Sequence, residues 1–178
     1  MDLIPVRSGH SVAAGPYVFE VIEAPGSNPG NLALYERDAS LLFCGDVTLK
    51  GMPDFIDEVQ PYLVTLERLL EIEADHLLPN IGRATGRSRW MIKRALSFLN
   101  NFLSNAPAAM HEAPTVVEFI ETDLGHRLDS LAELVLQLQR YRRPMDELAR
   151  ARMIETEGEG VARRYGVDVE DPRGKVRD

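Results

Sequence analysis

Residues 22–46, IEAPGSNPGNLALYERDASLLFCGD, hold two short apolar runs between clusters of turn-forming residues and end in a carboxylate that follows a glycine. Alternating apolar and polar residues bounded by Gly, Pro, Asn and Asp are typical of β-strands joined by turns. The two runs, 31–36 and 40–46, together with YVFEVIE at 17–23, therefore predict consecutive strands. A carboxylate held out at the end of a strand can bind a metal ion, so Asp46 is a candidate ligand.

Helical spacing replaces this alternation from Phe55 onward. Residues 54–73 carry one apolar stripe at the helical period, with Asp54 as a candidate cap. Pro61 would bend this helix unless the helix begins there, with the proline in its first turn. Strands followed by helices, with one strand–helix–strand crossover, indicate an α/β class with a small mixed sheet and helices on one face. The remaining elements that we expect are a buried strand at 76–79 and helices at 86–105, 115–125, 126–141 and 144–164.

The composition limits the classes of function. The chain has 178 residues and a formal net charge of −8, which argues against a nucleic-acid groove because phosphate binding needs a basic field. No apolar run approaches the roughly 20 residues that span a bilayer, and the N-terminus lacks the pattern of a signal peptide. The single cysteine, Cys44, excludes an intrachain disulfide and a cysteine-rich zinc site, and we expect it to be buried. We therefore expect a cytoplasmic protein with no nucleic-acid or membrane partner.

Two longer stretches, APGSNPGNLALYERDASLLFCGDVTL and YLVTLERLLEIEADHLLPNIG, resemble a known family. In order and spacing, residues 15–105 are similar to the second half of a metallo-β-lactamase superfamily domain. That half has a Thr-Pro-Gly-His-Ser-Pro-Gly turn, a strand ending in Leu-Phe-x-Gly-Asp and a strand ending in Pro-Gly-His-Gly. The resemblance implies the C-terminal half of a metallo-β-lactamase-like αββα sandwich, with an appended C-terminal helical region. The expected division is a half-domain at 1–105, a helical extension at 106–165 and a charged tail at 166–178.

The same resemblance identifies where metal ligands would lie. The family binds one or two metal ions, usually zinc, and uses metal-activated water to attack an ester, amide, thioester or phosphoester. Its ligands come from a His-x-His-x-Asp-His stretch in the first half, the turn His, the Asp of Gly-Asp and the last His. In this chain the turn His corresponds to Ser27, the Asp to Asp46 and the last His to Ile81, and the first-half stretch has no counterpart. The resemblance therefore leaves Asp46 as a remnant ligand between two degenerate positions.

The histidines, taken without the family, lead to the same conclusion. Zinc catalysis needs about three protein ligands, drawn from His, Cys or carboxylates. His10 in SGHS copies the lost His-Ser pair, but it lies before the first matched strand. His76 and His126 suit structural positions, one before a buried strand and the other near a helix start. The chain has four histidines, none spaced as a His-x-His or i, i+4 pair: His10, His76, His111 and His126.

Three further features each have two interpretations. Asp46 is either a ligand or a turn carboxylate that accepts backbone N–H groups after Gly45, and we favour the turn. The segment PGSNPGN at 25–31 either cradles an anion or is a tight turn between strands, and we again favour the turn. Trp90 with Arg87 and Arg89 is either a docking surface or a solvated basic face.

Two hypotheses of function follow. In the first, the chain is a non-catalytic, pseudoenzyme-like subunit with a structural or binding role in a homo- or hetero-oligomer. The exposed sheet face would then be covered by a second copy or by a protein partner, since a large apolar patch is otherwise left in water. In the second, the chain is the accessory half of a metal-dependent hydrolase whose His-x-His-x-Asp-His motif is on a partner chain. We expect no cofactor for this chain alone, and zinc only where a partner completes the site.

Overall fold

The computed structural model describes residues 4–48, 51–53, 55–110, 115–151, 153–157 and 164–166. The chain divides into two compact units, Met1–Asn100 and Asn101–Asp178. The boundary falls within the long helix α2 (Ser88–Ala109). None of the described helices is long and apolar enough to cross a membrane.

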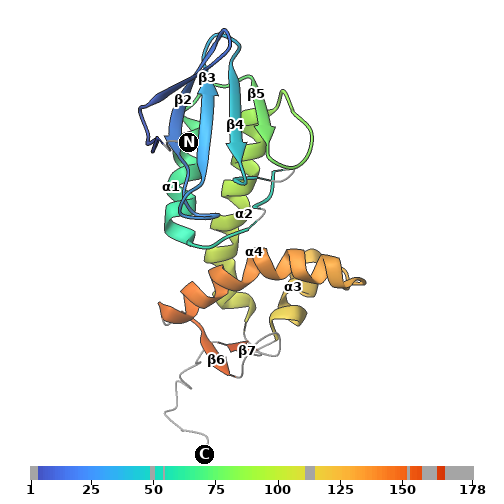
Figure 1. Ribbon diagram of the computed structural model, residues 1–178. Coiled ribbons are helices and arrows are strands. Elements are labelled where there is room, and N and C mark those ends of the chain that lie inside the picture. Colours follow the sequence, from blue (N-terminus) through green and yellow to red (C-terminus); the bar gives the residue numbers. More distant parts are fainter. Residues whose placement is uncertain are drawn as a thin grey trace, which may run out of the picture. The chain divides into compact units, whose positions relative to one another are not determined.

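The first unit is built on a five-stranded mixed sheet with the strand order β1-β2-β3-β4-β5 (Figure 1). Strands β1 to β4 are antiparallel neighbours, whereas β5 pairs with β4 in parallel. Four strands confirm the expected ones, but β1 is an addition to them, because its sequence SVAA is short and barely alternates. The strands are β1 (Ser11–Ala14), β2 (Tyr17–Glu23), β3 (Leu32–Glu36), β4 (Leu41–Gly45) and β5 (His76–Pro79).

Helix α1 (Val59–Leu70) makes the crossover between β4 and β5. The helix expected at 54–73 is present over the shorter range 59–70. Glu58 occupies its N-cap position and makes no side-chain cap hydrogen bond. Pro61 therefore lies in the first turn, where a backbone N–H has no intrahelical acceptor and its absence costs little. Asp54, the expected cap, lies outside the described residues.

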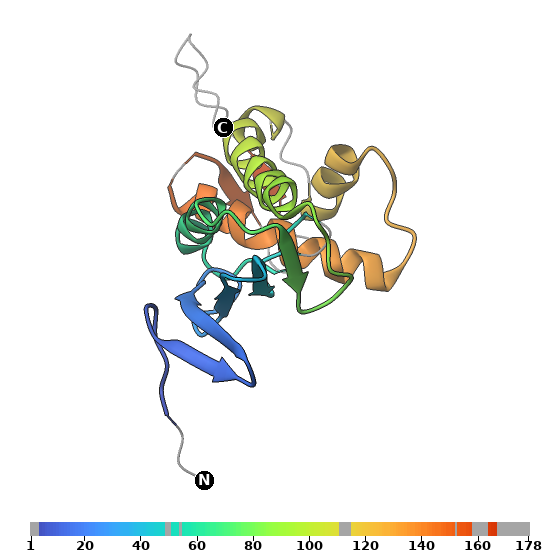
Figure 2. The same ribbon diagram turned by 90° about the horizontal axis from the view of Figure 1, so that it is seen from above.

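One face of the sheet is buried along β4 and β5. The register places Leu42 beside Leu77, and neither side chain has exposed surface. Cys44 is two residues beyond Leu42, so it lies on the same face, and it is also fully buried. Helices α1 and α2 lie on one side of the sheet in both Figure 1 and Figure 2, which accounts for this burial. The buried apolar residues of the two helices in this unit are Val59, Tyr62, Leu66, Leu69, Ile92, Ala95 and Leu99.

The opposite face of the sheet is largely apolar and partly exposed, although Val21 and Glu36 on this face are buried. Phe43 pairs with Leu34 in β3 and with Leu78 in β5, and all three side chains keep part of their surface exposed. Phe19 lies on the same face, with its ring centroid 5.7 Å from that of Phe43 in a T-shaped arrangement. No described helix of the first unit covers this face, which looks toward the reader in Figure 1. Phe19, Leu34, Phe43 and Leu78 are called the apolar sheet face below.

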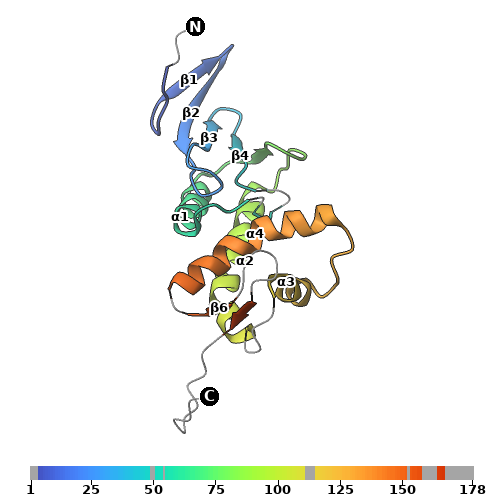
Figure 3. The ribbon, with the colours of Figure 1, turned by 60° about the horizontal axis from the view of Figure 1, so that its bottom comes forward.

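The second unit contains the end of α2, two further helices and a short hairpin (Figure 3). The side chain of Thr115 accepts the backbone N–H of Glu118, while the Glu118 carboxylate accepts the backbone N–H of Thr115, which forms a capping box. Gly125 ends the same helix with a φ of 72°, a conformation that favours glycine. The elements are α3 (Val116–Leu124), α4 (Leu131–Arg150), β6 (Glu155–Glu157) and β7 (Arg164–Gly166), the last two antiparallel.

Three aromatic rings form the centre of the second unit. Phe102, Phe119 and Tyr141 contact one another edge to face, with ring centroids 5.6 to 6.2 Å apart. The Tyr141 hydroxyl donates a 2.5 Å hydrogen bond to Asp123 Oδ2. Burial and this contact together raise the pKa of Tyr141 well above its usual range. The unit therefore has an apolar core of its own.

The prediction of a separate fifth helix at 144–164 is wrong. Helix α4 instead continues through Pro144 to Arg150, and the chain then forms the β6–β7 hairpin. Pro144 and its neighbours on the same helical face are buried, so packing offsets the roughly 3 kcal/mol that a proline costs inside a helix. The buried residues that carry this stripe along α4 are Tyr141, Pro144, Met145 and Leu148. Most of the charged tail expected at 166–178 lies outside the described residues.

Candidate functional site

Three strands of the sheet end at one edge, and the predicted ligand positions follow them. Strand β4 runs antiparallel to β3 and parallel to β5, so β2, β4 and β5 all point the same way (Figure 1). Ser27 lies in the turn after β2, Asp46 directly follows β4, and Ile81 comes two residues after β5. The fold therefore brings all three positions to the carboxyl edge of the sheet.

Asp46 is partly exposed and hydrogen-bonded to an amide. Asn80 Nδ2 donates to Asp46 Oδ1 at 3.0 Å, and the backbone N–H of Asn80 donates to the carbonyl of Gly45 at 3.0 Å. The expected turn carboxylate is thus found with a side-chain donor in place of the expected backbone N–H groups. Gly45 has a φ of 58°, and a Cβ there would lie 2.5 Å from Asn31 Oδ1. The turn that positions Asp46 therefore requires glycine at position 45.

Ser27 is buried, and its hydroxyl lacks a partner. Only 2% of its surface is exposed, and Ser27 Oγ has no hydrogen bond within the described part of the chain. The preceding residue fixes this turn against α1, because the Gly26 carbonyl accepts the backbone N–H groups of Asp57 and Glu58. Thr65 Oγ1 adds a 2.7 Å hydrogen bond to the carbonyl of Pro25. The segment is therefore a tight turn docked on a helix, as favoured from the sequence.

The carboxyl edge does not fit a metal ion. Ile81 is 60% exposed and has no donor atom, and a neutral serine hydroxyl is a poor substitute for imidazole. Among the described residues, no three His, Cys, Asp or Glu side chains are grouped so that they could hold a metal. The described residues of this edge offer one carboxylate, two amides and one buried hydroxyl, so no metal-dependent step can be derived from them.

The histidines lie away from this edge or outside the described residues. His10 is exposed and its Nδ1 accepts the backbone N–H of Arg7 at 3.3 Å, which makes it part of a turn. His76 is the exposed first residue of β5. His111 lies outside the described residues. Cys44 is buried beneath the sheet, which raises the pKa of its thiol to about 12 and leaves it protonated.

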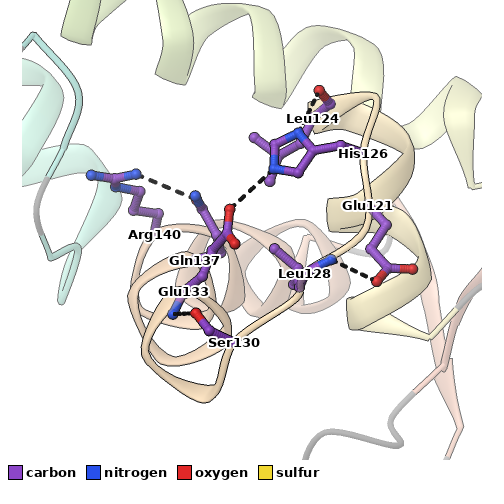
Figure 4. Close-up of polar contacts among 8 residues, drawn as sticks. All are labelled: Glu121, Leu124, His126, Leu128, Ser130, Glu133, Gln137 and Arg140. Carbon is purple, nitrogen blue, oxygen red and sulfur yellow. Dashed lines mark hydrogen bonds and ion pairs between the residues drawn. The ribbon is translucent and has the colours of Figure 1, made fainter.

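His126 lies in the loop between α3 and α4, beside a shallow hollow (Figure 4). Its Nε2 is 3.0 Å from Glu133 Oε1 in the first turn of α4, and its Nδ1 is 3.3 Å from the Leu124 carbonyl. Glu121 accepts the backbone N–H of Leu128 at 2.9 Å in the same loop. Contact with Glu133 raises the pKa of His126. These contacts hold the loop in place, and the hollow is lined by Glu118, Glu121, Thr122, Gly125, His126 and Arg127.

Sequence reasoning missed Asn80 and Asn31, the two amides that support the carboxyl edge. Asn31 is buried, and its Nδ2 donates to the Ala24 carbonyl at 3.0 Å across the β2–β3 turn. The signal that could have found Asn80 is its position, because it directly follows a strand at the edge where Asp46 lies.

Solved structures of other proteins share the fold described above. The metallo-β-lactamase family protein TTHA1429 from Thermus thermophilus superimposes with a TM-score of 0.71 at 16% identity, over 94% of this chain and 55% of that one. A β-lactamase domain protein from Burkholderia ambifaria gives a TM-score of 0.72 at 21% identity, over 93% and 52%. The chain has the metallo-β-lactamase fold. It spans about half the length of these two structures.

Sequence comparison gives a shorter match. No family model matches the chain. The acyl-coenzyme A thioesterase MBLAC2 of Gallus gallus is 31% identical over 70 residues, which are 38% of this chain and 25% of that protein. The likeness to metallo-β-lactamase proteins predicted from the two motif-bearing stretches is confirmed by the solved structures.

Proposed function

We propose that this chain is a non-catalytic, metallo-β-lactamase-fold subunit that serves a structural or binding role in an oligomer. The observation that carries the proposal is the state of the carboxyl edge. Asp46 is hydrogen-bonded to Asn80, Ser27 is buried without a partner in the described part of the chain, and Ile81 has no donor atom to offer either. With this set the chain needs no cofactor of its own, and the site is a degenerate one.

The apolar sheet face supports the assembly part of the proposal. Phe43 and Leu34 lie next to each other on adjacent strands, and both are partly exposed on a face that no described helix of the first unit covers. Sheets of apolar residues stack face to face at about 10 Å, which removes such surface from water. We propose that a second β-sheet packs there, from a second copy or from a separate chain.

A charge placed on this face tests the proposal by light scattering. Phe43→Lys should abolish the association that is made through this face, because an ammonium group would be buried between two sheets. Val64→Lys is the matched control, because Val64 lies on α1 with 61% of its surface exposed. This variant should leave the assembly unchanged. A wild-type chain that neither self-associates nor co-purifies with another protein, or an assembly that tolerates Phe43→Lys, would contradict the proposal.

A second candidate function is the accessory half of a metal-dependent hydrolase. The observation that favours it is the partly exposed carboxylate of Asp46 at the carboxyl edge. In addition, the relative that matches part of this chain, MBLAC2, is named an acyl-coenzyme A thioesterase. On this alternative a partner chain supplies the His-x-His-x-Asp-His motif, and zinc is bound only in the complex. Zinc that appears in a co-purified complex and is lost with Asp46→Ala would favour it over the first proposal.

A further inference from the structure

The first turns of α2 carry a basic surface that the proposed function does not use. Two exposed cations, Arg83 and Arg87, lie in the loop before α2, and a third, Lys93, lies within the helix; we call these three residues the basic strip. None of the three forms an ion pair within the described part of the chain. Trp90 lies among them with 51% of its surface exposed, and the Arg94 guanidinium is 5.4 Å from its ring centroid. The surface is thus an exposed aromatic ring surrounded by cations, in a chain with a net charge of −8.

The stability of α2 does not explain this arrangement. The N-terminus of a helix carries a partial positive charge, so cations there are unfavourable and carboxylates are favourable. The first turn of α2 has no acidic residue, and its last turn has no basic one. The charges at the start of α2 are therefore the opposite of those that would stabilise this helix. Local arrangements that do not favour the fold are expected at functional surfaces.

An acidic surface lies directly beside the basic one. Glu71, Glu73 and Asp75, which we call the acidic strip, are exposed in the connection between α1 and β5. These carboxylates also form no ion pair within the described part of the chain. Both strips belong to the first unit, so their relative positions are fixed by that unit alone.

Hydrogen bonds hold the two strips side by side. Ser88 Oγ donates to the carbonyl of Ala74, and Arg89 Nη1 donates to the carbonyl of Leu70 at 3.2 Å. Ser40 supports the acidic side, because its Oγ accepts the backbone N–H of Asp75 at 2.9 Å. The strips are therefore adjacent, rigidly held and of opposite charge, yet their side chains do not pair with each other.

We propose that this surface binds a second copy of this chain in a two-fold symmetric dimer. A two-fold axis brings one patch against the same patch, so the basic strip of each copy meets the acidic strip of the other. Trp90, which lies within the basic strip, then faces the acidic strip of the other copy, and Trp and Arg are the residues that most often dominate interface energy. A polyphosphate or an anionic membrane suits the surface less well, because the acidic strip would repel it. This dimer is independent of the apolar sheet face and of the proposed function.

The dimer should be visible by light scattering and sensitive to salt. Charge pairs at an interface rim weaken as ions screen them, so the dissociation constant should rise at least about tenfold between low salt and roughly 0.5 M NaCl. Trp90→Ala should weaken the dimer by about tenfold or more at low salt. A wild-type chain that remains monomeric at low salt, at the concentrations of a crystallisation trial, would overturn the proposal.

A charge swap provides the decisive arm. Arg87→Glu/Lys93→Glu reverses two of the three charges of the basic strip, and Glu71→Lys/Glu73→Lys reverses two of the three charges of the acidic strip. Each variant alone should lose the salt-sensitive dimer, and an equimolar mixture of the two should restore it, because each strip again faces its opposite. The matched control is Arg7→Glu/Arg127→Glu, which changes the net charge as much as the first variant but at exposed residues elsewhere. It should dimerise like the wild type.

Two outcomes would assign the association to another surface. Variants that still dimerise alone would overturn the proposal, as would a mixture that stays monomeric while both variants keep the wild-type melting temperature. A dimer that is insensitive to both strips and to salt but is lost with Phe43→Lys belongs to the apolar sheet face. In that case the proposed function stands and this inference fails.

Discussion

Asn80 Nδ2 donates a 3.0 Å hydrogen bond to Asp46 Oδ1, which joins the ends of two parallel strands. The bond links the first residue after β4 to the first residue after β5. Asp46 is the one position of the family's second-half ligand set that keeps a donor suited to a metal, and its carboxylate has a neutral amide as partner. A structural role for Asp46 makes several results predictable.

Removal of either partner of this bond should cost little and affect no metal. Asp46→Ala and Asn80→Ala should each lower the free energy of unfolding by about 0.5 to 1.5 kcal/mol, the usual net value of such a bond in a partly exposed position. Urea unfolding of both variants and of the double variant measures this. The double variant should cost less than the sum of the two, since both remove the same bond. Additive costs would show that the bond contributes nothing.

Ser27 should be replaceable by alanine without loss. Its buried hydroxyl has no partner in the described part of the chain, so Ser27→Ala removes a desolvated polar group and should leave the melting temperature equal or higher. Ser27→His should destabilise the fold by about 1 to 3 kcal/mol, because only 2% of the residue is exposed and the site must be overpacked. Ile81→His is the matched control, since that side chain is 60% exposed and a change there should be nearly neutral. A loss of stability with Ser27→Ala would mean that the hydroxyl is satisfied after all.

Gly26 should be the least tolerant glycine of the β2–β3 turn. Its φ is 120°, and a Cβ there would lie 2.3 Å from the backbone Cα of Tyr62, which cannot move away without shifting α1. Gly26→Ala should therefore lower the melting temperature strongly or prevent folding. Gly30→Ala in the same turn is the control, because its nearest neighbour would be Asn28 Oδ1 at 3.8 Å. Similar melting temperatures for the two variants would refute this view of the turn.

The contact between His126 and Glu133 should make stability depend on pH. Glu133 raises the pKa of His126 in the folded state above the usual value of about 6.5. The stabilising effect is therefore fully present below that usual value and is lost as the pH rises through the folded pKa. His126→Ala should lower the melting temperature more at about pH 5.5 than at about pH 8.5, as followed by circular dichroism. Equal effects of His126→Ala at the two pH values would contradict the prediction.

Much of the first unit could be predicted from the sequence because its strands obey simple rules. The run that forms β2 partly alternates apolar and polar residues, and those that form β3 and β4 are short apolar runs between turn-forming residues. The apolar stripe around Tyr62 predicts α1. The order of the motifs also places Ser27, Asp46 and Ile81 at one edge, since parallel and antiparallel neighbours fix which strand ends meet.

The remaining differences have physical causes that short patterns do not carry. Strand β1 exists because the edge of β2 offers it a partner, which SVAA alone does not indicate. Pro144 suits a helix start, but burial of Met145 and Leu148 continues α4 through it. The amide partner of Asp46 is not evident from the sequence, because a hydrogen bond between residues 34 positions apart depends on the parallel pairing of β4 and β5.

The metal content of the purified chain tests the central claim most directly. The chain, expressed alone in medium supplemented with zinc and freed of loosely bound ions, should contain far less than one metal ion per molecule by mass spectrometry. Asp46→Ala should not change that value, because the carboxylate is a structural partner of Asn80 rather than a ligand. Stoichiometric zinc in the wild-type chain, lost in Asp46→Ala, would contradict the claim that this half-domain has no metal site of its own.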